Sequence, residues 1–246
     1  MRSGRLLLFA TTAITVTAGS TAARATGLEA TFRAGYGSAG DKSPVAYEPT
    51  GTSTADANAI WSGKAKPYGA GVVLDAAVGY RPLSFISFGV TGGWRKSAVD
   101  SSSIRSQASG VERSGLQAGL YVRGYLPLVG LLTGFDPWAS VGANYVYDKQ
   151  TYDQPTPAPM SVTLTHHGVG VPLAIGIDYR VLSTLAVGPS FQYEIVTGVG
   201  GCMTPKHNPP GADDSRQCSD ADTRMRVTAA KDYQIWSIGL GLRLAL

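Results

Sequence analysis

Charge is scarce in this chain. Asp, Glu, Lys and Arg make up 15% of its 246 residues, whereas about 25% is usual in soluble globular domains. Its mean hydropathy of +0.01 is too polar for a bundle of membrane helices, each of which needs about 20 consecutive apolar residues. No such run occurs after the N-terminal segment. The composition therefore disfavours both a charged soluble domain and a helical membrane protein.

Motifs for nucleotide, metal or redox chemistry are also missing. The sequence has no Walker motif, no dinucleotide-binding glycine pattern, no CxxC pair and no basic-aromatic array. His166 and His167 are adjacent, so on a strand they would point to opposite faces and could not easily share one metal ion. His207 has no acidic partner at a fixed spacing. We therefore predict no catalytic residue, no cofactor and no metal site.

Residues 1–25 have the features of a secretory signal peptide. Arg2 and Arg5 precede an apolar stretch, and Ala23-Arg24-Ala25 is an A-x-A cleavage signal. Its removal lowers Lys plus Arg from 21 to 18 against 17 acidic residues, so the mature chain, 26–246, is almost neutral and has no charge basis for binding nucleic acid. In an exported protein the two cysteines, Cys202 and Cys218, are expected to form a disulfide.

Alternation with a period of two dominates the rest of the chain. In 236–246 every second residue is large and apolar, and the residues between them are small or charged. The same pattern recurs in seven further segments: 28–36, 68–80, 86–94, 116–122, 139–147, 169–179 and 185–195. No apolar face carries a charge, and the other faces are rich in Gly, Ala and Ser. A charge facing lipid would cost about 2–4 kcal/mol at the midplane, so the exclusion indicates strands of a membrane barrel.

The connections alternate between short and long. The short ones are 81–84, 127–136 and 181–184, and the long polar ones are 38–67, 95–113, 148–165 and 196–230. Short periplasmic turns and long outer loops are typical of outer-membrane barrels. We predict an all-β fold, an eight-stranded antiparallel up-and-down transmembrane β-barrel, in which the last strand pairs with the first.

Aromatic residues near the predicted strand ends are candidates for the two interfacial girdles. The outer girdle would contain Tyr36, Tyr68, Trp94, Tyr147, Tyr193 and Tyr233, and the periplasmic girdle would contain Tyr80 and Tyr179. Pro172 and Pro189 fall within strands, where each removes a hydrogen-bond donor, so we expect a bulge or local irregularity at both.

Three segments carry a resemblance to a known family. GLQAGLYVRGYLP (115–127), GVGVPLAIGIDYR (168–180) and WSIGLGLRLAL (236–246) resemble the small eight-stranded outer-membrane barrels of the OmpA/OmpX-like group, over 26–246. The resemblance implies a monomer in the bacterial outer membrane, in contact with outer-membrane lipids and lipopolysaccharide and inserted by the barrel-assembly machinery. Members of that group usually end in Phe, where this chain has Leu246.

Charged residues inside the strands all fall on the inward face. They are Glu29, Arg33, Asp75, Arg81, Arg123, Asp178, Arg180, Glu194 and Arg243. Arg243 is expected to join Asp178, Arg180 and Glu29 near the periplasmic end. The nine residues could form a structural network of ion pairs that plugs the lumen, or a polar constriction that gates ions, because the inward glycines leave room for water.

The leading functional hypothesis is a non-enzymatic barrel that presents extracellular loops and serves envelope integrity or surface interaction, with an unknown surface ligand. Loop 196–230 is either a binding loop or a tolerated insertion. One alternative is a small pore or conduit for ions or small solutes. A third is a lipid A-modifying enzyme at the outer rim, for which His167 and Glu194 are candidates without an evident serine beside them.

Overall fold

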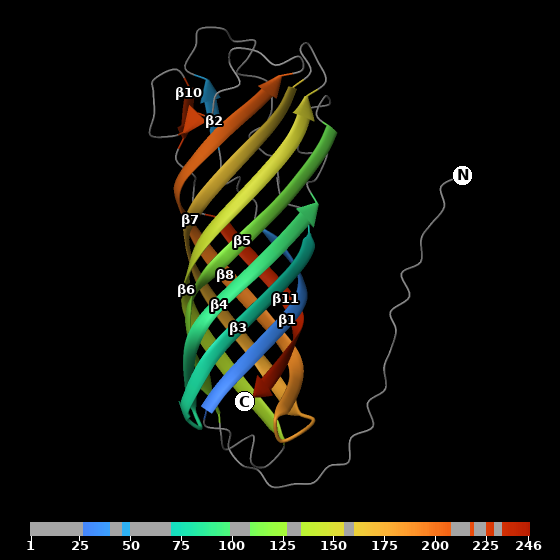
Figure 1. Cartoon of the computed structure of the whole chain (residues 1–246), viewed down its shortest axis with the longest axis vertical. Coiled ribbons are helices and arrows are strands. Elements are labelled where there is room, and N and C mark those ends of the chain that lie inside the picture. The colour runs from blue at the N-terminus through green and yellow to red at the C-terminus, as the bar shows by residue number, and fades with distance from the viewer. Residues whose placement is uncertain are drawn as a thin grey trace, which may run out of the picture.

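The strands of this protein close into a single barrel. The computed structural model describes residues 27–39, 46–49, 70–98, 109–126, 134–154, 160–207, 217–218, 225–228 and 233–246. The barrel strands are β1 (Gly27–Ala39), β3 (Gly71–Leu83), β4 (Ile86–Ala98), β5 (Ser109–Tyr125), β6 (Phe135–Gln154), β7 (Met160–Arg180), β8 (Leu185–His207) and β11 (Tyr233–Ala245). Each pairs antiparallel with its neighbours in chain order, and β11 pairs with both β8 and β1 (Figure 1). The predicted eight-stranded fold and its closing pair are confirmed.

Three short strands lie outside this ring. β2 (Ala46–Pro49) and β10 (Met225–Thr228) form a separate two-stranded sheet, and β9 (Gln217–Cys218) pairs with β8. Figure 1 places β2 and β10 at the end of the barrel opposite the C-terminus. None of the described residues forms a helix long and apolar enough to cross a membrane.

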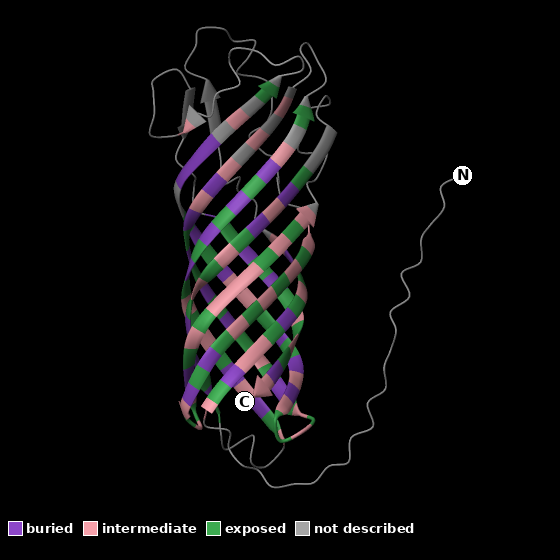
Figure 2. Ribbon diagram, in the orientation of Figure 1, coloured by how far each residue is buried: buried purple, intermediate pink, exposed green. Residues whose placement is uncertain are grey.

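Large apolar side chains cover the outside of the barrel. Phe32, Leu120 and Leu240 expose 54%, 64% and 64% of their surface, while the residues that alternate with the apolar ones are mostly buried. The resulting alternation is visible along most of the described barrel wall, with an interruption at residues 91–93 on β4 (Figure 2). Because so much exposed apolar surface is stable only against hydrocarbon, this belt spans the bacterial outer membrane.

Aromatic residues flank the belt largely as the sequence predicts. Tyr36, Trp94 and Tyr147 are exposed on the outer surface toward the long connections, and Tyr80 and Tyr179 toward the short turns. Tyr193 lies on the same outer face of β8, and Tyr68 lies outside the described residues. The prediction is wrong for Tyr233, which is 1% exposed inside the barrel.

The strands β5–β8 are longer than the hydrophobic pattern predicts. They contain 17, 20, 21 and 23 residues, against 13 in each of the other four barrel strands. Much of the predicted loops 148–165 and 196–230 is therefore strand. The outer face changes from apolar to polar at this point, with Lys149 following Tyr147 on β6 and Thr165 preceding His167 on β7. A strand segment without an apolar face shows no hydrophobic period in the sequence, so the alternation could not reveal it. We call this extension the β5–β8 projection, and its polar outer face places it beyond the membrane.

The turns at the opposite end are short. Two residues, 84–85, join β3 to β4, and four, 181–184, join β7 to β8. A register shift between Tyr80 and Leu83 precedes the first turn. At Pro172 and Pro189 the pairing with one neighbouring strand is interrupted, but the register is the same on both sides. The expected irregularity is present without a bulge, because only the single donor of each proline is lost.

Candidate functional site: the barrel lumen

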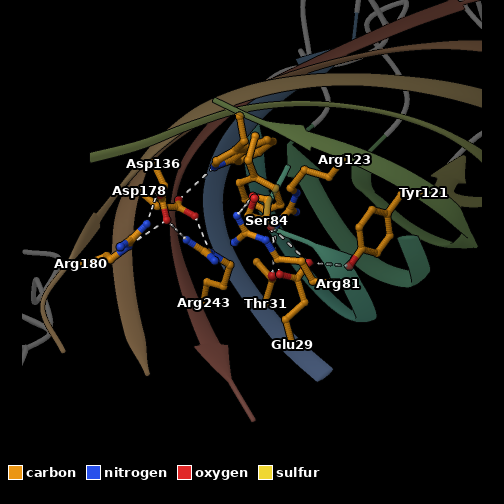
Figure 3. A network of polar contacts seen from close by, with 12 residues as sticks. Glu29, Thr31, Arg81, Ser84, Tyr121, Arg123, Asp136, Asp178, Arg180 and Arg243 are labelled. Atoms are coloured by element: carbon orange, nitrogen blue, oxygen red, sulfur yellow. Dashed lines mark hydrogen bonds and ion pairs between the residues drawn. The ribbon is translucent and has the colours of Figure 1, made fainter. Parts of the chain in front are cut away.

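Four charged side chains form a compact network at the periplasmic end of the lumen. Asp136 on β6 accepts hydrogen bonds from Arg180 at 2.6 and 3.0 Å and from Arg243 at 2.9 Å. Arg243 also donates to Asp178 at 2.9 Å, and the indole of Trp138 donates to Asp178 at 3.0 Å (Figure 3). Two cations and two anions thus neutralise each other in a buried cluster, as a charged group in a narrow barrel requires.

Tyrosines and arginines surround Glu29 beside that network (Figure 3). The Glu29 carboxylate is 2% exposed and accepts hydrogen bonds from the Tyr125 hydroxyl at 3.0 Å and the Tyr121 hydroxyl at 3.4 Å. The Arg81 guanidinium stacks 3.7 Å from the centre of the Tyr125 ring and donates to the carbonyl of Ser84. Arg123 lies 4.3 Å from the centre of the Trp138 ring. This cluster fills its part of the lumen with aromatic rings as well as charges.

Arg33 and Asp75 meet in the middle of the lumen. They are cross-strand partners on β1 and β3, with Arg33 Nε 3.5 Å from Asp75 Oδ2. The amide of Gln117 donates to Asp75 at 3.0 Å. Arg33 donates to Gln192 at 2.7 Å and to the hydroxyl of Ser237. The pair therefore ties strands from both sides of the barrel together.

Toward the outer end, a second ion-pair network crosses the lumen. Asp148 accepts from Arg113 at 2.9 Å, from Arg95 at 3.2 Å and from the hydroxyl of Tyr233. Arg95 also lies 3.6 Å from Glu194. The side-chain amide of Asn144 donates a hydrogen bond to Glu194 at 3.0 Å. Asp148 and Glu194 are 4% and 1% exposed at the side chain. This network occupies the outer half of the lumen in the same way as the clusters below it.

Glycines on the inward face make room for these side chains. A Cβ added at Gly79 would collide with the hydroxyl of Tyr121, and one at Gly93 would meet the amide of Gln117 at 2.8 Å. Similar collisions occur at Gly115 with Arg95, at Gly170 with Glu194 and at Gly176 with Trp138. The space that these five glycines leave is filled by polar and aromatic groups of the barrel itself, rather than by the water that the sequence suggested.

The structure places all nine charges identified in the sequence on the inner side of the wall. Seven are buried, and the side chains of Asp75 and Arg180 are 12% and 26% exposed. Arg243, Asp178 and Arg180 come together as expected, whereas Glu29 lies with Tyr121 and Tyr125 in the neighbouring cluster.

Four further charged residues complete the networks: Arg95, Arg113, Asp136 and Asp148. The sequence assigned them to connections because each lies where the apolar face of its strand ends. The sequence did contain a signal for them, because alternate residues of a strand face the same side. Arg95 is two residues after the inward-facing Gly93 on β4, and Asp148 continues the inward series of Asn144 and Val146 on β6.

The histidine pair points to opposite faces, as predicted. His166 is 2% exposed inside the barrel, with its ring against that of Tyr233 at 5.6 Å between centres. His167 stacks on Tyr145 on the outer face. Since Glu194 lies inside the lumen, His167 and Glu194 do not form a common site at the rim. Within the part of the chain that the structure describes, no group of three or more His, Cys, Asp or Glu residues could hold a metal ion.

Cys202 and Cys218 form a disulfide. They are also cross-strand partners on β8 and β9. The bond therefore fastens β9, 16 residues further along the chain, to the last strand of the β5–β8 projection.

A small chamber remains between the central pair and the periplasmic clusters. Its volume is about 80 Å³, and a buried water needs about 10–15 Å³ of such space. Among its lining side chains are Arg33, Asp75, Arg123 and Ser190. The chamber lies between the central pair and the periplasmic clusters, which both contribute to its lining.

The closed barrel, the apolar belt and the charged lumen define a small eight-stranded β-barrel of the bacterial outer membrane. No protein-family model matches the sequence, and no curated protein matches it significantly. The predicted resemblance to small eight-stranded outer-membrane barrels is confirmed at the level of architecture. No family model assigns the chain to the OmpA/OmpX-like group.

Solved structures of outer-membrane proteins are similar to this chain, one of them with a TM-score above 0.5. A major outer membrane protein from Thermus thermophilus has a TM-score of 0.53 at 13% identity, over 87% of this chain and 99% of that one. Neisserial surface protein A has a TM-score of 0.49 at 12% identity, over 90% and 98%. The outer membrane protease OmpT from Escherichia coli has 0.47 at 8%, over 90% and 97%. At these identities the likeness concerns the fold alone.

Proposed function

We propose that this protein is a non-enzymatic outer-membrane barrel that holds an extracellular β-structure above the membrane for surface interaction or envelope integrity. In this proposal it acts as a monomer, with its belt against outer-membrane lipids and lipopolysaccharide, after insertion by the barrel-assembly machinery. The lumen charges serve the rigidity of the barrel rather than transport or catalysis.

The observation that carries the proposal is the filling of the lumen at three levels. The Asp136 and Glu29 clusters, the central Arg33–Asp75 pair and the Asp148 network each cross the interior. Ion pairs that are this well buried are costly to break, because separation leaves an uncompensated charge. A lumen built in this way is suited to a rigid support and poorly suited to a steadily open channel.

The β5–β8 projection is the part offered to the outside. Its outward residues are polar, with Lys149, Thr163 and Lys206 on β6, β7 and β8. The disulfide fixes β9 to its last strand. A sheet continuous with the barrel wall holds such a surface in a fixed orientation, which favours recognition over mere solvation.

Labelling of intact cells tests this presentation. A Lys149→Cys variant should react with a membrane-impermeant maleimide without lysis, and a matched Ser84→Cys variant at the short-turn end should react only after lysis. Strong labelling at residue 84 in intact cells, with none at residue 149, would show that the barrel has the opposite orientation and would contradict the proposal.

A conduit for ions or small solutes is the second candidate. The chamber of about 80 Å³ is the observation in its favour, because a water-filled space could link the ends if the pairs around it separated. Swelling of proteoliposomes in small sugars and amino acids would support this candidate, and impermeable vesicles would count against it.

A further inference from the structure

The lower lumen contains one positive charge more than its carboxylates balance. The Asp136 network holds two arginines and two aspartates, and Arg33 is paired with Asp75. The remaining described charges are Arg81, Arg123 and Glu29, which together carry a net charge of +1. No carboxylate of the described residues forms an ion pair with either of these two arginines.

Arg123 and Arg81 are both buried with only neutral groups as direct partners, and Arg123 is the one of the two that lines the chamber. Arg123 is 6% exposed. One terminal nitrogen approaches the hydroxyls of Thr31 at 3.4 Å and Tyr125 at 3.5 Å, which is at the long limit of a hydrogen bond. Its guanidinium lies over the rings of Trp138 and Tyr121, and its Nε has no hydrogen-bond partner. Ring faces attract a cation without neutralising it.

The chamber of about 80 Å³ lies directly beside this cation, since Arg123 and Arg33 both line it. Three buried polar atoms on its wall lack hydrogen-bond partners in the described structure, namely Arg123 Nε, Asn144 Oδ1 and Ser190 Oγ, and Arg33 Nε and Asp75 Oδ2 are satisfied only by their mutual approach at 3.5 Å. Unpartnered buried donors and acceptors of this kind are ordinarily satisfied by ordered water or a bound ion.

We infer that the chamber binds a small inorganic anion of the size of chloride. The anion lies against the Arg123 guanidinium and balances its charge, and ordered waters satisfy Asn144 and Ser190. Asp178 and Arg243, which also line the chamber, neutralise each other at 2.9 Å and so do not reverse the sign of the site. A cation would lie beside an unbalanced arginine, and a volume of about 80 Å³ is too small for a large organic anion such as gluconate.

Crystals grown from the detergent-refolded full chain in sodium bromide give the direct test. We expect an anomalous bromide peak inside the chamber, within hydrogen-bond distance of Arg123. Density for water alone at that position, with bromide only on the outer surface, would overturn the inference.

Stability in solution provides an independent measurement. Replacing gluconate, which is too large for the chamber, by chloride at constant ionic strength should raise the Tm of the wild type in a saturable way. Arg123→Gln should abolish the rise. Arg113→Gln, which removes an arginine of similar burial from the Asp148 network, should retain it. An equal response in the wild type and Arg123→Gln, or no response in the wild type, would contradict the inference; if Arg123→Gln does not fold, the bromide result decides.

Discussion

Gly79 on β3 lies against the hydroxyl of Tyr121 on β5, although β4 separates the two strands. A tyrosine that reaches across a neighbouring strand inside a barrel needs a partner without a side chain. Its hydroxyl is then free to donate to Glu29. The pair shows how the glycine-rich inner face and the polar networks depend on each other.

Gly79→Ala should therefore destabilise the barrel by about 1–3 kcal/mol, the usual cost of overpacking. The matched control is Gly92→Ala on the adjacent strand, where an added Cβ would meet nothing nearer than the carbonyl of Gln117 at 3.7 Å. Urea unfolding in lipid vesicles measures both. Equal stability of the two variants would show that the packing against Tyr121 does not matter.

Asp136 joins Arg180 and Arg243, so its neutralisation leaves two buried cations with one carboxylate between them. Asp136→Asn should lower the free energy of unfolding by about 3 kcal/mol, at the lower end of the cost of breaking a buried pair. The control is Glu112→Gln, which removes a surface ion pair with Lys96. The side chains of Glu112 and Lys96 are 71% and 52% exposed. That control should change stability by less than about 1 kcal/mol; a similar loss in both variants would argue against a buried network.

The membrane assignment predicts a strong penalty for charge on the belt. Leu120 on β5 is 64% exposed on the apolar belt. Leu120→Arg should lower the free energy of unfolding by about 2–4 kcal/mol. Lys149→Ala, on the polar projection, should be nearly neutral. Vesicle-based unfolding gives both values, and tolerance of Leu120→Arg would place that surface outside the hydrocarbon.

The disulfide should hold the projection rather than the barrel. The cysteines are 16 residues apart, and cross-linking a loop of that length contributes about 3 kcal/mol in the chain-entropy model. Because the bond lies beyond the belt, Cys202→Ala with Cys218→Ala should release β9 from β8, while the unboiled barrel should still migrate differently from the boiled chain on SDS gels. Loss of the gel shift would mean that the barrel itself requires the bond.

The fold could be predicted because lipid and lumen impose opposite chemistry on alternate residues. Where one face of a strand is apolar, this constraint reveals the strand, and it reveals eight strands and nine inward charges in all. The apolar face ends at the outer girdle, and beyond that point both faces of the strands are polar. Arg95, Arg113, Asp148 and Tyr233 were missed or misplaced for that reason. The partners of each charge also depend on register and barrel closure, as with Asp136 and Arg243, 107 residues apart.

The central claim is that the lumen is closed by its own side chains, and single-channel recording in planar bilayers tests it most directly. Removing both members of the central pair, Arg33→Ala with Asp75→Ala, takes out one cation and one anion together and leaves the Asp136, Glu29 and Asp148 clusters in the lumen, so this variant should stay closed as well. The wild type should show no steady open channel under the same conditions. Long-lived, uniform openings of the wild type would contradict the account and favour the conduit.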